Sequence, residues 1–342
     1  MTQIPAISSI LSPKHIAEYV SNSYGFYANT KCSILKTGIN HSYLITEASK
    51  KFVFRVYSFN WRTRLEIGEE LKLLLELNEN GTAVSFPIKN SLGHFIQTIK
   101  APEGERFAVL FSYAEGETIR NLSEKNCFNL GRTMAKMHQF TKDKTVDRKQ
   151  YNAEDLVGWA LSKAKERFTE SSYEMNYFIE ANKIISREFK EADRNKIREG
   201  VVHLDLWYDN MKIVNDAEFT FFDFDNCGNG WLFLDIAYSI MLIFRNEPNK
   251  DVFNKKLNSF YKGYDSIITV SAEEKRLLPY GGLAIWLHYT GVHVERYNDF
   301  ANHFLSEDFL KYWIQTVDAW MHFNDIEILI DSKTPKINKT II

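Results

Sequence analysis

The sequence is poor in features that mark several classes of protein. It has three cysteines, Cys32, Cys127 and Cys227. Because they are odd in number and far apart, we expect neither a disulfide framework nor a cysteine metal site, and a reducing compartment is favoured. The formal net charge is −2 and no basic block stands out, which argues against nucleic acid or an anionic membrane as a partner.

Long hydrophobic segments are also missing. The most apolar run, 231–244, is interrupted by Asp235 and is too short to cross a bilayer. The first ten residues lack the charged start and apolar core of a secretion signal. We therefore expect a cytoplasmic protein, and 342 residues are enough for two lobes with sizeable cores. No feature of the sequence indicates an oligomeric state.

The common glycine-rich phosphate loops, G-x-G-x-x-G and G-K-[ST], are absent from the position where a nucleotide-binding loop would be expected. Two short strands are predicted at 32–36 and 42–46, and the loop between them holds one glycine, Gly38, followed by Asn40. Taken alone, this loop reads as an ordinary hairpin turn. The alternative is a flexible loop whose backbone amides cover the phosphates of a nucleotide.

Three residues with the chemistry of metal-assisted phosphoryl transfer lie within 201–225. Apolar, β-prone runs at 211–214 and 219–224 flank a turn at 215–218, which predicts a β-hairpin. If the turn centres on residues 216 and 217, Asn210 lies opposite Asp223. A carboxylate and an amide oxygen suit Mg²⁺, which takes one or two ligands from protein. Asp205, five residues before Asn210, is suited to accept the proton of an attacking hydroxyl.

The spacing H-x-D-x-x-x-x-N from His203 to Asn210, followed by D-x-D, resembles the catalytic and metal loops of protein kinases. In detail it is more similar to the aminoglycoside phosphotransferase and choline kinase family, with its homoserine-kinase-like and stress-response-kinase branches. Gly228 and the D-I-A segment at 235–237 continue the likeness. Leu204 departs from it, because the family commonly has glycine there.

This resemblance implies ATP and Mg²⁺ as cofactors, Asp205 as the catalytic base, and Asn210 and Asp223 as metal ligands. It also implies that His203 holds the loop rather than transferring a proton. Asp225 has three possible roles, which are binding a metal, binding a substrate amine, or bonding within the loop.

Arg55 and Glu70 are expected to form an ion pair. Arg55 lies between apolar neighbours in a predicted strand at 51–57, and Glu70 borders the buried stripe of a predicted helix at 66–78. A carboxylate there is costly without a partner. The pair resembles the strand-lysine and helix-glutamate pair of kinases, which positions the nucleotide phosphates, with arginine in place of lysine. The alternative is that Glu69 and Glu70 form an exposed face and Arg55 reaches solvent.

The fold implied by the resemblance is an α+β, protein-kinase-like fold of two lobes. The small β-rich lobe is expected over 1–113, covering the nucleotide, and the larger helical lobe over 114–342, with the catalytic and metal loops and the acceptor site. A predicted strand at 107–113 leads to a hinge formed by Ser112, Tyr113 and Ala114. Backbone groups of this hinge would bind the adenine.

The implied reaction is transfer of the γ-phosphoryl group of ATP to a hydroxyl of a small molecule, such as an amino alcohol, a homoserine-like compound, a sugar or an aminoglycoside. One alternative is a serine or threonine of a protein as the acceptor, and another is a catalytically silent nucleotide-binding scaffold. Trp207, Tyr208 and Trp286 are candidates for a wall that binds an amine, although packing in the core is the simpler interpretation.

Overall fold

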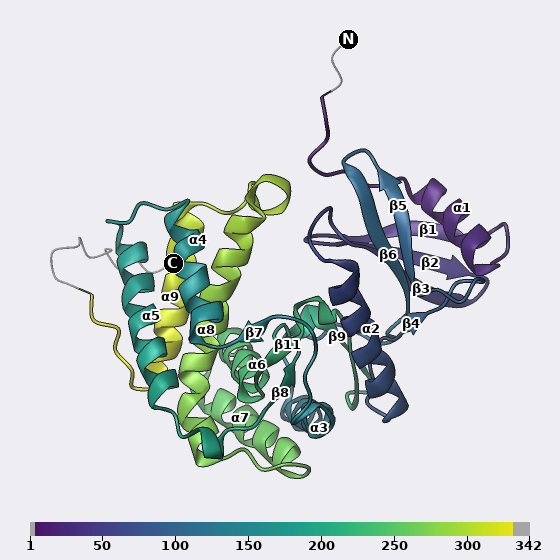
Figure 1. The fold of residues 1–342 in the computed structure, drawn as a ribbon. Helices are drawn as coiled ribbons and strands as arrows, with labels where there is room; N and C mark the ends of the chain where they lie inside the picture. Colours follow the sequence, from purple (N-terminus) through teal and green to yellow (C-terminus); the bar gives the residue numbers. More distant parts are fainter. Residues whose placement is uncertain (1–3, 331–342) are drawn as a thin grey trace.

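The computed structural model describes residues 4–330, which form two lobes (Figure 1). The N-terminal lobe holds a six-stranded sheet with a helix on each face, and the C-terminal lobe is mainly helical with two small sheets. This confirms the predicted two-lobe α+β fold. The last residues of the range expected for the second lobe, 331–342, lie outside the described part of the chain.

The N-terminal sheet is antiparallel, in the order β1-β2-β3-β6-β4, with β5 paired to β6. Its elements are α1 (Pro13–Tyr24), β1 (Lys31–Thr37), β2 (His41–Glu47), β3 (Lys50–Val56), α2 (Arg64–Glu79), β4 (Pro87–Ile88), β5 (Ile96–Ala101) and β6 (Gly104–Ser112).

Alternation along β3 decides which way Arg55 points. Side chains of a strand face opposite sides in turn, and Phe54 and Val56 join the buried cluster that packs under α1. Val53 and Arg55 therefore face the other side of the sheet, toward α2. On that side the pocket between the lobes is lined by both residues.

A capping box starts α2. The Thr63 hydroxyl accepts from the Glu66 backbone N–H at 3.2 Å, and the Glu66 carboxylate accepts from the Thr63 N–H at 2.8 Å, which satisfies otherwise unpaired donors at the helix end. Ile67, Glu70 and Leu74 then follow at helical spacing on the buried face. Glu70 is fully buried, so the alternative of an exposed face for this residue is wrong.

The C-terminal lobe packs its helices around α6 and α8, which are almost wholly buried. Its elements are α3 (Glu124–Thr141), β7 (Gln150–Tyr151), η1 (Glu154–Gly158), α4 (Trp159–Lys165), α5 (Tyr173–Glu191), η2 (Arg194–Lys196), β8 (Glu199–Val202), η3 (Tyr208–Asn210), β9 (Met211–Val214), β10 (Glu218–Phe221), η4 (Phe224–Asn226), β11 (Gly228–Trp231), α6 (Phe233–Asn246), α7 (Lys250–Asp265), α8 (Ala272–Glu295), η5 (Tyr297–Ala301) and α9 (Glu307–Phe323).

The predicted hairpin is present as β9 and β10, but its register differs by one residue from the expectation. Met211 pairs with Phe221, and the Phe222 N–H donates to the Asn210 carbonyl at 3.1 Å, so Asn210 lies opposite Phe222 rather than Asp223. The reason is the loop, in which residues 215–217 separate the strands and Asn215 and Asp216 have φ of 52° and 55°. Asp223 itself has a φ of 66°, which turns the chain after the strand.

The hairpin is bonded to segments on both of its sides. The Ser85 N–H donates to the Phe221 carbonyl at 2.9 Å, and Glu117, just after β6, exchanges two backbone bonds of 3.0 Å with Ile213. Gly116 permits this approach, because a Cβ there would lie 2.4 Å from the Ile213 oxygen and the φ of 107° disfavours other residues. The position of Asp223 is thereby linked to the sheet lobe.

No helix among residues 4–330 is long and apolar enough to cross a membrane. Within the same residues, Cys32, Cys127 and Cys227 are all free.

Candidate active site

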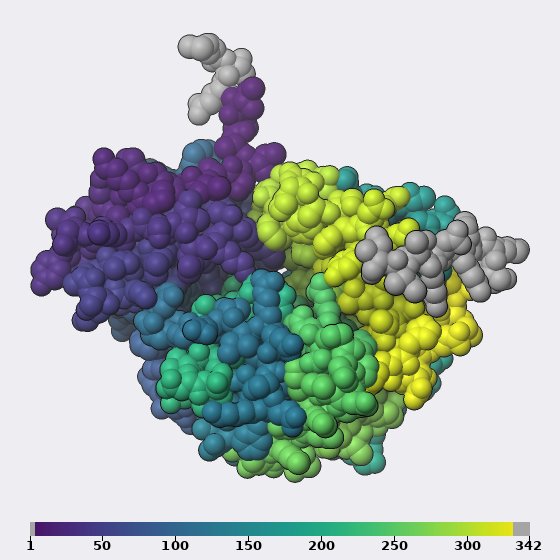
Figure 2. Space-filling model, turned by 180° about the vertical axis from the view of Figure 1, so that it is seen from behind, coloured from purple at the N-terminus to yellow at the C-terminus, as the bar shows by residue number. Residues whose placement is uncertain are grey.

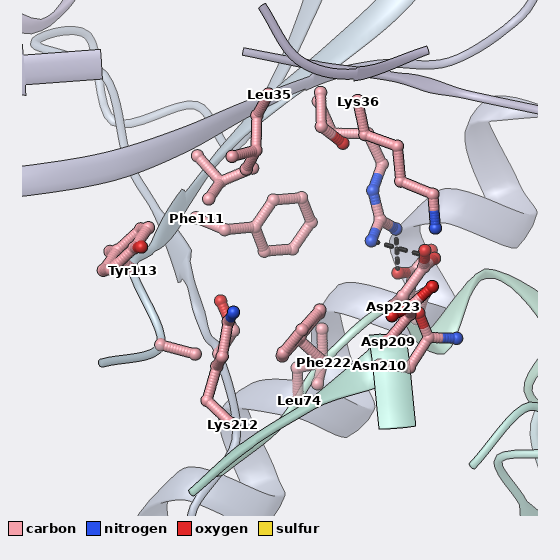
Figure 3. A pocket seen from close by; sticks show the side chains of 16 residues that line it. Leu35, Lys36, Leu74, Phe111, Tyr113, Asp209, Asn210, Lys212, Phe222 and Asp223 are labelled. Atoms are coloured by element: carbon pink, nitrogen blue, oxygen red, sulfur yellow. Dashed lines mark hydrogen bonds and ion pairs between the residues drawn. The ribbon is translucent and has the colours of Figure 1, made fainter. Parts of the chain in front are cut away.

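A cavity of about 460 Å³ lies between the sheet and the β9–β10 hairpin (Figure 3). Figure 3 shows its two ends: apolar side chains gather at one, while Lys36 and the carboxylates of Asp209 and Asp223 lie at the other. The apolar part is lined by Leu35, Val53, Leu74, Phe111, Tyr113 and Phe222. Such a cavity suits a ligand with one flat apolar part and one charged part.

Arg55 connects α2 with the metal loop. Its Nη1 lies 3.0 Å from Glu70 Oε1 and its Nη2 lies 3.0 Å from Asp223 Oδ1. The Tyr57 hydroxyl donates to the other Glu70 oxygen at 3.0 Å, and Arg148 lies 3.8 Å from that oxygen. The expected Arg55–Glu70 pair is therefore present. The planar guanidinium serves two carboxylates at once, which a single lysine ammonium would do less well.

Asp235, at the start of α6, holds the catalytic loop. Its carboxylate accepts from the backbone N–H of His203 at 2.9 Å and of Leu204 at 2.6 Å, and it contacts His138 Nε2 at 3.1 Å. Leu204 is fully buried and has a φ of 66°, a conformation that favours glycine. The family glycine is thus replaced here by a residue that keeps the left-handed turn.

His203 is buried and makes the contacts of a loop-holding residue. Its Nε2 contacts the Phe222 carbonyl at 3.1 Å, and its Nδ1 accepts from the Asp205 N–H at 3.2 Å. These two partners require a neutral ring with the proton on Nε2. Burial lowers the pKa of His203, which favours the same neutral form.

Asp205 has the perturbed acidity of a candidate general base. Burial, followed by the nearby Asp223 carboxylate, raises the pKa of Asp205 from 3.8 to about 7. Hydrogen bonds from Tyr289 and Asn210 act in the opposite direction. The Asn210 amide N–H₂ donates to Asp205 Oδ2 at 2.8 Å and to the Asp205 carbonyl at 3.0 Å. A base whose pKa lies near neutrality is well matched to proton transfer from a hydroxyl.

Asp223 and Asn210 offer oxygen ligands that fit a magnesium ion. The Asp223 side chain is 34% exposed, and its Oδ1 is paired with Arg55. The Asn210 amide nitrogen points to Asp205, so the Asn210 amide oxygen is left free to bind a metal ion. Residues 4–330 contain no cluster of three or more His, Cys, Asp or Glu that could hold a metal. A hard ion that completes its shell with water and phosphate oxygens needs no such cluster.

A second cavity of about 320 Å³ adjoins the first. The two share Lys36, Ser42, Asn210 and Asp223, and Asp205 lines the second one only. Viewed from behind, the purple N-terminal residues and the yellow-green residues near 300 approach each other, and the surface is hollowed between them (Figure 2). Aromatic side chains from several helices line this second cavity: Tyr238, Trp286, Tyr289, Phe300 and Trp313.

Three residues expected at the nucleotide do not line the first cavity: Gly38, Asn40 and Ser112. Gly38 and Asn40 line the second cavity and not the first. The Asn40 side chain accepts a hydrogen bond of 3.1 Å from the Ser58 N–H. Gly38 lies close to Phe300, since a Cβ added to the glycine would lie 3.9 Å from that ring. Ser112 lines neither cavity, since its N–H donates to the Phe86 carbonyl and its hydroxyl accepts from the Phe86 N–H. Tyr113 and Ala114 do line the first cavity.

Asp225 borders the second cavity, but its carboxylate is bonded to the protein. It accepts from Trp61 Nε1 at 2.6 Å and from Arg62 Nε at 3.0 Å. Burial would raise the pKa of Asp225, yet Arg62 and Arg148 outweigh this and hold it at about 2. These contacts bond Asp225 to the segment just before α2 rather than to its own loop, so they match none of the three expected roles.

Sequence reasoning missed several residues of the site. Lys36, near the end of β1, lines both cavities, and its ammonium lies 5.5 Å from the centre of the Trp207 ring. Trp207 is therefore at the second cavity with a cation already on its face. Tyr289 of α8 lines the second cavity with Asp205 and lowers the pKa of that carboxyl, and Lys212 of β9 lines the first cavity. The sequence gave no sign that these three polar residues belong to the site, because their place in it depends on contacts between segments that lie far apart in the chain.

The family is decided by comparison with known proteins. A model of the phosphotransferase enzyme family, APH, matches residues 33–266. The chain belongs to this APH family. Membership confirms the resemblance read from the catalytic loop, and it makes the protein a phosphotransferase whose acceptor group is a hydroxyl.

Individual relatives agree with this family. The homoserine kinase of Rhizobium meliloti (strain 1021) is 26% identical over 276 residues, covering 80% of this chain and 76% of that protein. The structure of the microcompartment-associated aminopropanol kinase has a TM-score of 0.72 at 20% identity and covers 93% of this chain and 99% of that one. Amicoumacin kinase hAmiN, in complex with AMP-PNP, Ca²⁺ and Ami, has a TM-score of 0.73 at 17% identity, covering 92% and 94%. The two solved structures confirm the kinase-like fold.

Proposed function

We propose that this APH family protein transfers the γ-phosphoryl group of ATP to a hydroxyl of a small molecule in the second cavity. The observation that carries the proposal is the junction of the two cavities at Asn210 and Asp223, with Asp205 on the second side only. In-line phosphoryl transfer requires a nucleotide on one side of a metal site and a hydroxyl beside a base on the other. The nucleotide-covering lobe is residues 1–113 and the acceptor lobe residues 114–342.

Each residue has a separate task in this mechanism. Asp205 orients the acceptor hydroxyl and takes its proton, and Arg55, positioned by Glu70, contacts the nucleotide phosphates. Asn210 and Asp223 hold a magnesium ion, which neutralises charge on the phosphate oxygens when bound. Tyr113 and Ala114 contact the adenine. Catalysis then depends on positioning and on charge rather than on a covalent intermediate.

The size and lining of the second cavity support a small acceptor over a protein serine or threonine. It measures about 320 Å³, and side chains of α6, α8 and α9 line it on the helical side. The homoserine kinases among the relatives and the aminopropanol and amicoumacin kinases among the structural neighbours are named for small acceptors. An extended protein segment would need a longer open groove.

The test separates nucleotide binding from turnover. Asp205→Asn is expected to bind Mg²⁺-ATP with unchanged affinity and to lose phosphate transfer. Asp223→Ala is expected to lose the magnesium-dependent part of ATP binding. Isothermal titration with and without magnesium measures binding, and transfer from labelled ATP to amino alcohols, homoserine, sugars, aminoglycosides and a generic protein measures turnover.

Asp143→Asn is the matched control, because that carboxylate is 78% exposed and lies on the surface after α3. It should change neither quantity. Normal turnover by the Asp205 variant would refute the assignment of the base, and labelling of the protein substrate alone would favour the protein kinase alternative.

A further inference from the structure

Arg245 is an exposed cation that lines the second cavity and has no acidic partner among the described residues. It lies in the last turn of α6 and lines the second cavity but not the first. Within residues 4–330 it forms no ion pair under 4.0 Å. Its Nη2 donates to the Tyr312 hydroxyl at 2.9 Å, and its guanidinium carbon lies 5.3 Å from the centre of the Trp286 ring. These contacts hold the guanidinium in place and leave several of its N–H groups free.

The other charged residues of this cavity are paired, act as the proposed base, or also line the nucleotide cavity. Asp223 is paired with Arg55 and Asp225 with Arg62, each at 3.0 Å. Lys36 also lines the nucleotide cavity, and Asp205 is the proposed base. Arg245 is thus a charged group that lines the second cavity alone and has no task in the proposed phosphotransfer mechanism.

The aromatic walls favour an anion over a cation. Lys36 lies over the Trp207 ring and Arg245 over the Trp286 ring, so an ammonium approaching either indole face would meet a like charge instead of an empty π surface. The indole N–H of Trp286 is buried and has no hydrogen-bond partner among the described residues.

We propose that the acceptor is a hydroxy acid, a small alcohol that carries one carboxylate, and that Arg245 binds this carboxylate while Asp205 receives the hydroxyl. The inference rests on the proposed function, since it takes the second cavity as the acceptor site. A carboxylate fits the planar fork of one guanidinium and its single charge. A phosphate dianion would require a second cation beside Arg245. Among residues 4–330, the second cavity has none apart from Lys36, which it shares with the nucleotide cavity. Arg245 is a specificity-determining residue in this scheme, and it takes no part in proton transfer.

The experiment compares hydroxy acids with their own uncharged analogues. Transfer from labelled ATP is measured for 3-hydroxypropionate, 4-hydroxybutyrate and homoserine, for the primary amide of each, and for ethanolamine and choline. The proteins are the unchanged chain, Arg245→Gln, Arg245→Lys and the control Arg132→Gln, which removes an exposed arginine of α3 without an ion pair in the described structure. Thermal unfolding of each variant is recorded, because a cation in the last turn of a helix also favours the helix dipole.

We expect kcat/KM for at least one acid to exceed that of its amide by about 10- to 100-fold, the range of one charge-assisted contact. Arg245→Gln should remove this preference through a higher KM for the acid while leaving rates with the amide within about twofold. Arg245→Lys should retain part of the preference, and Arg132→Gln all of it.

Preference for amides or for cationic alcohols, or an unchanged KM for the acid in Arg245→Gln, would overturn this inference while leaving the proposed function intact. Phosphorylation of none of these alcohols, nor of the sugars and aminoglycosides tested above, would overturn both.

Discussion

The raised pKa of Asp205 leads to a pH dependence that an ordinary carboxylate would not give. Only the ionised form of Asp205 can accept a proton, so the fraction of active enzyme follows its titration. With a pKa of about 7, kcat/KM should be about a tenth of its maximum at pH 6, about half at pH 7 and about nine-tenths at pH 8. An aspartate that kept its usual pKa of 3.8 would give a flat profile over this range.

A titration of the ATP phosphates could produce a similar profile, so a variant is needed that acts on Asp205 alone. The Tyr289 hydroxyl lies beside Asp205 in the second cavity and lowers the pKa of that carboxyl. Tyr289→Phe removes this hydroxyl, so the pKa of Asp205 should rise and the midpoint of the profile should move to higher pH. A midpoint set by the nucleotide would be the same in both proteins.

The assay is initial-rate phosphate transfer from pH 5.5 to 9 at Mg²⁺-ATP concentrations well below KM, for the unchanged chain and Tyr289→Phe, because kcat/KM for the nucleotide then reports Asp205 before the metal is bound. A flat profile, or a midpoint that Tyr289→Phe moves to lower pH, would refute the reasoning from burial and charge. The Asp143→Asn control should follow the unchanged protein at every pH.

Three further predictions concern stability, measured by urea unfolding. Asp205→Asn should raise the free energy of unfolding at pH 8 by about 1–3 kcal/mol. An acid whose pKa is raised in the folded state destabilises the fold as pH rises from its unfolded pKa through about 7. A variant as stable as the unchanged protein at pH 4 but less stable than it at pH 8 would contradict this. Arg55→Met should cost about 3 kcal/mol by leaving Glu70 buried without its nearest cation, and Arg55→Met/Glu70→Met should recover most of the stability but no activity; a double variant as unstable as the single one argues against the pair. Leu204→Gly should be more stable than Leu204→Ala by about 1 kcal/mol, since only glycine is unstrained at a φ of 66°, and the opposite order would exclude strain at this position.

Local signals were sufficient for part of the fold and site. The alternation in β3 and the buried stripe of α2 were enough to predict the Arg55–Glu70 contact, because a carboxylate on a buried helix face requires a partner. The hairpin was also located from its two apolar runs. Its register was wrong by one residue, since the left-handed conformations of Asn215 and Asp216 determine the loop and neither is a glycine.

Features that depend on the meeting of distant segments could not be predicted. Gly38 and Ser112 were assigned to the nucleotide from their positions in the chain, whereas contacts with Phe300 and Phe86 decide where they lie. The second cavity combines residues of the β1–β2 loop, the catalytic loop and helices α6, α8 and α9. Arg245 carries no sequence signal of a binding residue, because the last turn of a helix is an ordinary place for a cation.

The use of arginine rather than lysine at position 55 follows from the way the metal loop is held. Asp223 follows a hairpin that is bonded to both lobes, and its φ of 66° fixes the direction of its side chain. The Arg55 guanidinium reaches Glu70 and Asp223 with different nitrogens, each at 3.0 Å. Arg55 can therefore stay paired with Glu70 while its other terminal nitrogen contacts a phosphate oxygen. The compact ammonium of a lysine would have to share one charged point among Glu70, Asp223 and the phosphate. The departure from the family residue is thus compatible with the proposed phosphate contact, and it makes that contact dependent on the α2 position that Glu70 provides.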